Sequence, residues 1–152
     1  MSRVVHRYKS RLDDLFGKVA SVHDLELQAH WARYLCVLVS GFIEIAVKEI
    51  LDDYAARRAS PEISNYVSRR LSRETNLKMN KIIDLLSQFN GDWGEELERQ
   101  TQGELKDAID SIVANRHRIA HGQDTGVSFL QVKGWYEKTV DVVDVIRRML
   151  SP

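Results

Sequence analysis

The sequence predicts an all-α protein in which four long antiparallel helices form a bundle, with short helices inserted between the second and the third. Apolar residues recur three and four positions apart along most of the chain, which is the period of a helix with one buried face. Only 2 prolines and 8 glycines interrupt the 152 residues. The connections between the periodic stretches are short, as they are between the antiparallel neighbours of a bundle.

The first two long helices are expected at residues 4–20 and 24–58, each with apolar side chains at helical spacing. Ser60 followed by Pro61 is a cap and first-turn signal for a shorter helix that ends near Arg73. A further helix is expected at residues 77–89, closed by Asn90 and Gly91. Residues 92–100 form either a short acidic helix or an ordered loop.

The third and fourth long helices are expected at residues 103–121 and 128–150, joined by a turn at 122–126. They should pack side by side. The length and the composition, 43% hydrophobic and 29% charged, predict one globular domain over residues 1–152.

Charge and cysteine content limit the classes of function. The formal net charge is zero, so contacts with nucleic acid must come from local patches. The single cysteine, Cys36, excludes an intrachain disulfide and is expected to be a core thiol. The N-terminus shows no apolar signal segment, and the most apolar stretch, residues 34–47, is too short to span a membrane. We therefore expect a cytoplasmic protein that does not associate with membranes.

The segment Leu105–Gly122, LKDAIDSIVANRHRIAHG, is the most informative for function. Its last turns gather Arg116, His117, Arg118 and His121, and Gly122 stands where a left-handed helix C-cap is expected. Histidine takes and gives protons near neutral pH, and arginine is a permanently charged, forked ligand for phosphate. The cluster indicates phosphate chemistry without a metal.

Arg116, four intervening residues and His121 match the R-x4-H motif of the HEPN superfamily of small helical domains. That family usually has a polar residue, Asn, Asp or His, after the arginine, and His117 stands there. The motif also lies late in a predicted helix that is followed by another long helix. The sequence therefore resembles toxin- and defence-associated HEPN ribonucleases.

This resemblance implies a metal-independent endoribonuclease that needs no cofactor. The ribose 2′-hydroxyl of RNA would attack the neighbouring phosphate and leave a 2′,3′-cyclic phosphate and a 5′-hydroxyl. His121 would transfer protons, Arg116 would hold the phosphate, and His117 would either orient the site and contact RNA or simply be exposed.

The resemblance also implies partners. One histidine cannot readily serve both sides of one phosphorus, and HEPN nucleases generally form homodimers in which two motifs face a shared cleft. RNA would be the substrate. An inhibitory antitoxin or another defence partner would restrain the enzyme.

Two residues are supporting candidates. Glu44 interrupts an apolar run, where an unpaired buried carboxylate is costly. It either faces a polar seam or anchors Arg116 from the second helix. Asn115, directly before the arginine, is the other candidate.

Basic residues between positions 57 and 81, together with Arg118, are weaker candidates for contacts with RNA. The residues assigned to this possible contact with the RNA backbone are Arg69, Arg70, Arg73, Lys78 and Lys81. A solvated helix face is the alternative reading. Trp93 and Trp135 could stack on bases, but packing is the commoner role at helical spacing.

Three alternatives complete the interpretation. His117 and His121 have the spacing of zinc ligands, but Arg118 would repel a metal ion and no second cluster offers ligands. No metal site is therefore assigned. The chain could instead be a non-catalytic HEPN domain that binds RNA or nucleotides or mediates dimerisation. A more distant alternative is a helical adaptor whose motif arose by coincidence.

Overall fold

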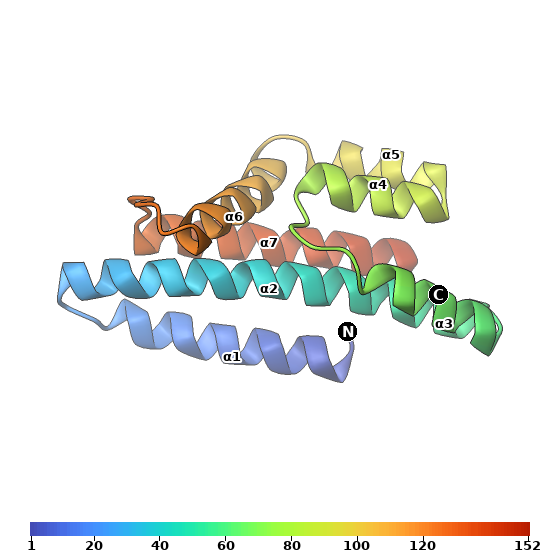
Figure 1. The fold of residues 1–152 in the computed structure, drawn as a ribbon, viewed down its shortest axis with the longest axis horizontal. Coiled ribbons are helices and arrows are strands. Elements are labelled where there is room, and N and C mark those ends of the chain that lie inside the picture. Colours follow the sequence, from blue (N-terminus) through green and yellow to red (C-terminus); the bar gives the residue numbers. More distant parts are fainter.

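The computed structural model describes residues 1–152 as seven helices without a strand (Figure 1). This confirms the predicted all-α fold. The bounds are α1 Arg3–Ala20, α2 Leu25–Arg58, α3 Pro61–Leu71, α4 Met79–Phe89, α5 Gly91–Thr101, α6 Glu104–Ala120 and α7 Phe129–Leu150. Residues 92–100, left open between a helix and a loop, belong to α5. None of the helices combines the length and the apolarity that a membrane crossing requires.

The four long helices form the body of the molecule, and consecutive ones run in opposite directions (Figure 1). α6 packs against α7, as expected, and also against α2. α2 packs mainly against α7 and α1, and α2 and α7 run in the same direction (Figure 1). α4 and α5 form a pair above this body, and α3 continues from the end of α2.

Local signals set most helix ends. The Asp24 side chain accepts the N–H groups of Glu26 and Leu27 at the start of α2. Ser128 and Gln131 form a reciprocal capping box at the start of α7. These side chains satisfy N–H groups that have no partner within the helix. The ends of the long helices therefore lie within two residues of the predicted positions.

The connection between α3 and α4 is longer than predicted. We expected helices to reach Arg73 and to resume at residue 77, but α3 ends at Leu71 and α4 begins at Met79. Asn76 has a φ of 53°, a left-handed conformation that no helix residue adopts. Lys78 provides no side-chain cap for α4. Instead Asp110 of α6 accepts the Met79 N–H at 3.0 Å, so the start of α4 is fastened to the motif helix.

The core lies around α2, whose middle part, residues 35–52, has no exposed side chain. Cys36 is a buried free thiol, as predicted, and its Sγ donates to the Ile112 carbonyl of α6 at 3.6 Å. Burial raises the pKa of this thiol to about 12. Trp93 packs edge-on against Tyr54, with ring centroids 4.9 Å apart, and beside Phe89. Trp93 is therefore used for packing, and Trp135 also packs against the core.

Candidate functional site

The motif lies at the C-terminal end of α6, where the chain turns sharply. His121 is the C-cap residue that directly follows α6, and Gly122 comes next with a φ of 71°. The Gln123 N–H donates to the Arg118 carbonyl at 2.9 Å, and the Gly122 N–H donates to the Ile119 carbonyl at 3.0 Å. This is the Schellman arrangement, which favours glycine at its left-handed position. It turns the chain away and leaves His121 exposed.

His117 and His121 lie one helical turn apart on the exposed face of this end. Their ring centroids are 4.4 Å apart, and the ring planes are tilted by 58°. No group of three or more His, Cys, Asp or Glu side chains forms around them. Two exposed imidazoles in contact provide proton-transfer groups that solvent and a docked ligand can reach.

Arg116 is half-buried and points to a different neighbour. Its Nη1 donates to the side-chain oxygen of Asn76 at 3.2 Å, and no hydrogen bond joins it to either histidine. Arg116 also forms no ion pair with a carboxylate. Its positive charge therefore remains available to an anion.

Glu44 of α2 is half-buried and accepts the backbone N–H of Asn76 at 3.0 Å. Of the two roles considered for Glu44, the structure gives it a place in a polar seam, without direct contact with Arg116. The seam nevertheless includes Arg116, because Asn76 binds Glu44 through its backbone and Arg116 through its side chain.

Asn76 was missed by the sequence interpretation, which left it in the short connection between two expected helices. The available signal was its residue type. Asparagine is enriched among the non-glycine residues that adopt left-handed conformations between regular elements. Its two long-range contacts could not be read from the pattern.

Asn115 is buried, and its side-chain N–H donates to the Ser111 carbonyl one turn earlier in α6, at 2.8 Å. The side chain thus bonds to its own helix. It makes no hydrogen bond with Arg116, His117 or His121.

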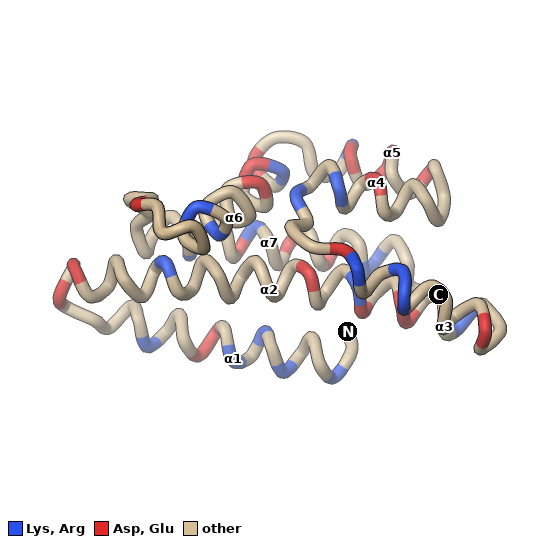
Figure 2. The backbone as a smooth tube through the Cα atoms, viewed as in Figure 1, with Lys and Arg blue, Asp and Glu red and all other residues tan.

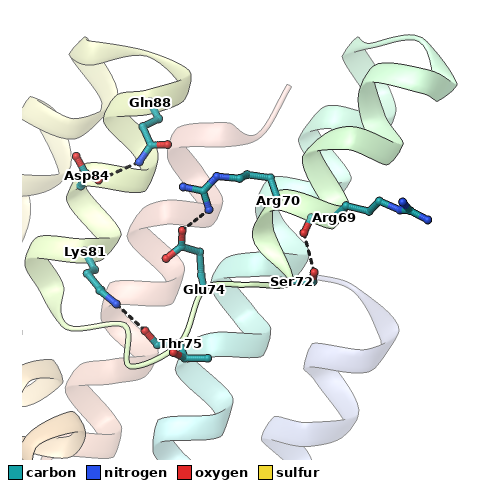
Figure 3. Close-up of polar contacts among 8 residues, drawn as sticks. All are labelled: Arg69, Arg70, Ser72, Glu74, Thr75, Lys81, Asp84 and Gln88. Carbon is teal, nitrogen blue, oxygen red and sulfur yellow. Dashed lines mark hydrogen bonds and ion pairs between the residues drawn. The ribbon is translucent and has the colours of Figure 1, made fainter.

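The basic candidates are all exposed; Arg118 lies near the end of α6, and the others lie on α3, on the connection to α4 and on α4 itself (Figures 2 and 3). Arg70 pairs with Glu74 at 2.7 Å, and Lys81 donates to the Thr75 carbonyl at 3.0 Å, next to Asn76. Of the six candidates only Arg70 forms an ion pair, and the side chains with neither an ion pair nor a hydrogen bond are those of Arg69, Arg73, Lys78 and Arg118. The connection that holds Arg116 is therefore bordered by unneutralised cations.

The surface beside the motif is only shallowly hollowed, between Arg33 of α2 and the turn at Gly122 to Asp124. Arg33 pairs with Asp124 at 3.3 Å and so fastens this turn to α2. A more enclosed hollow lies between Glu49, Arg57 and Arg147, at the end of the molecule that holds both termini (Figure 1). It contains no motif residue. One copy of the chain therefore presents the motif on an open face.

Comparison with protein families decides the relationship. The model of the RiboL-PSP-HEPN family matches residues 6–151, nearly the whole chain and the complete R-x4-H motif. The chain belongs to the RiboL-PSP-HEPN family. The resemblance to the HEPN superfamily is thereby confirmed, and the helical fold of this RiboL-PSP-HEPN protein agrees with it. Neither a search of curated proteins nor a search of solved structures found a match.

Proposed function

We propose that this RiboL-PSP-HEPN protein is a metal-independent endoribonuclease that acts as a homodimer. One observation carries the proposal: an exposed pair of histidines stands at the end of α6, on the same motif as an arginine that no carboxylate neutralises. Proton-transfer groups beside an available guanidinium are what phosphoryl transfer requires when no metal takes part.

The reaction would proceed by transfer within the RNA chain. A motif histidine removes the proton of the ribose 2′-hydroxyl, and the oxygen attacks the adjacent phosphorus. The bond from phosphorus to the 5′-oxygen breaks, and that oxygen receives a proton from a second histidine. The products carry a 2′,3′-cyclic phosphate and a 5′-hydroxyl. Arg116 stabilises the negative charge that grows on the phosphate oxygens, and His121 is the principal proton carrier.

The open face around the motif supports a dimeric enzyme. A substrate bound there by one copy would remain in contact with water, whereas two facing copies would enclose it in a cleft. Arg69, Arg73, Lys78 and Arg118 would then follow the RNA backbone beyond the cleft, each as a solvated positive charge.

The biological role follows from the family resemblance alone. We infer a toxin or antiviral defence effector that acts in the cytoplasm and is held inactive by a partner protein. HEPN ribonucleases of this kind need such restraint because unregulated cleavage of RNA would harm the cell that makes them.

The test is to incubate the purified protein with total RNA and tRNA in EDTA and to map the product ends. We expect cleavage without divalent ions, 5′-hydroxyl ends, and no cleavage of DNA. RNA with a 2′-O-methyl group at the scissile position should also resist, because it has no nucleophile. A requirement for a divalent ion, or equal cleavage of DNA, would contradict the mechanism.

A second function is favoured by one observation. Arg116 donates to Asn76 and makes no hydrogen bond with the histidines, as in a domain whose motif residues have structural roles. The protein would then be a non-catalytic HEPN domain that binds RNA or nucleotides or mediates dimerisation. RNA binding without any cleavage in the experiment above would support this alternative.

A further inference from the structure

We propose that Asn76 is a positioning residue, which holds Arg116 for the phosphate of the substrate while keeping the arginine apart from Glu44. The inference rests on the proposed ribonuclease function and assigns a new residue to its site. Asn76 lies in the connection between α3 and α4, outside the R-x4-H motif.

The backbone of Asn76 is held in an unusual conformation by contacts on both sides. Its φ of 53° makes it the only residue other than glycine with a positive φ. Its N–H donates to Glu44 Oε1 at 3.0 Å, and its carbonyl accepts the Lys78 N–H at 2.8 Å. Asp110 fixes the chain again at Met79. The connection is thus fastened to α2 and to α6, and the Asn76 side chain is presented to Arg116.

The chemistry of the acceptor explains why an amide is suitable here. The Asn76 oxygen is neutral, so it orients the guanidinium without cancelling its charge. Glu44 is close enough to bind Asn76, and its Oε1 accepts the backbone N–H. A direct pair between Glu44 and Arg116 would offset the positive charge that a phosphate needs. Arginine has five N–H donors, and Asn76 occupies a single Nη of the fork.

Two substitutions separate positioning from structural support. Asn76→Gly removes the amide but suits the left-handed backbone, so the variant should still fold. Asn76→Asp keeps the shape, tolerates the same backbone and places a negative charge against Arg116. Asn80→Asp is the matched control, because Asn80 is exposed on α4 and receives the same change of charge.

The experiment measures thermal unfolding, kcat and KM on an RNA oligonucleotide, and the Kd of its 2′-O-methyl analogue for each variant. Asn76→Gly should melt close to the wild-type temperature, while its kcat falls about 10- to 100-fold, as misplacement of a binding group causes. Asn76→Asp should lower kcat at least as much and also weaken binding of the analogue. Asn80→Asp should behave as the wild type. A purely structural Asn76 would not combine unchanged melting with lost kcat.

The proposal is overturned if both Asn76 variants keep kcat and analogue binding within twofold of the wild type while Arg116→Ala is inactive. It is also overturned if Asn76→Gly loses activity only because it unfolds. A wild-type protein that cleaves no RNA contradicts the proposed function instead. The Kd of the analogue then tests the role of Asn76. Weaker binding by Asn76→Asp but not by Asn80→Asp supports that role. The same Kd for Asn76→Asp and the wild type overturns it.

Discussion

The imidazole ring centroids of His117 and His121 lie 4.4 Å apart, on one side of the end of α6. In-line displacement at phosphorus places the attacking and the leaving oxygen on opposite sides. Two rings in contact cannot face each other across a phosphate group, so the proposed mechanism needs a second proton-transfer group from elsewhere. A second copy, related by a two-fold axis beside α6, would supply it.

We therefore predict a dimer in solution. Light scattering of the purified protein should give about twice the chain mass of 17.5 kDa at micromolar concentration. In the proposed mechanism each site needs both copies, so activity per chain should fall when the protein is diluted below the dissociation constant of the dimer. A monomer that keeps its full activity per chain on dilution would refute the shared site.

Cys36 should be chemically silent in the folded protein. Thiolate is the reactive form, and burial raises the pKa of this thiol from 9.0 to about 12. At pH 8, a disulfide reagent such as DTNB should react with the protein only after unfolding. Reaction of the native protein at the rate of a free thiol would show that Cys36 is accessible.

The same pKa predicts how pH changes stability. Between pH 9 and 12 the unfolded thiol loses its proton while the folded thiol keeps it, so the folded state binds more protons and the free energy of unfolding falls as pH rises. The Cys36→Ala variant has no thiol to lose a proton, so its stability lacks this dependence on pH. Its destabilisation relative to the wild type should therefore shrink above pH 9, as measured by urea unfolding at several pH values. A constant difference would contradict the assignment.

Asp110 should stabilise the fold through the start of α4. Its side chain accepts the Met79 N–H at 3.0 Å and replaces the cap that Lys78 does not provide. Asp110→Ala should lower the free energy of unfolding by about 1 kcal/mol, as loss of a helix cap does. Lys106→Ala is the control, because it removes the ion pair with Asp110 but leaves the cap. Equal destabilisation by both variants would assign the effect to the ion pair.

Arg69 and Arg70 should differ in their contribution to RNA binding, although they are adjacent and both exposed. Arg70 is paired with Glu74, whereas the Arg69 side chain extends freely (Figure 3). Arg69→Ala should weaken binding of 2′-O-methyl RNA and reduce its salt dependence by about one released counterion. Arg70→Ala should weaken RNA binding, and reduce its salt dependence, to a smaller extent. Equal losses would show that the Glu74 pair does not matter, and no loss in either variant would exclude this surface from contact with RNA.

The helices were predictable because their determinants are local. Asp24, Ser60 with Pro61, and Ser128 each mark a helix start within a few residues of the groups that they cap. The Schellman turn after the motif likewise needs only Gly122 at the right place. Periodicity showed which helix faces are buried. It did not show that α2 and α7 pack side by side in the same direction, because the apolar pattern of one helix does not show which helix packs against it.

The supporting part of the site could not be predicted, because its contacts join distant segments. Asn76 is 32 residues from Glu44 and 40 residues from Arg116. No local sequence pattern indicates a contact between residues so far apart in the chain. Asn115 was named for its place beside Arg116 in the sequence. Adjacent residues of a helix point in different directions, and in the structure its amide bonds to Ser111.

The most direct test of the central claim is the rate of RNA cleavage in EDTA by the wild type, Arg116→Ala and His121→Ala, measured side by side. His121 is exposed, so its replacement should remove proton transfer and leave the fold intact, as circular dichroism would show. Loss of Arg116 should cost about 10²–10³-fold in kcat, as loss of one donor to a developing negative charge does. We predict rapid cleavage by the wild type, with 5′-hydroxyl ends, and cleavage at least about 10²-fold slower by both variants. Cleavage by a folded His121→Ala at the wild-type rate would contradict the account.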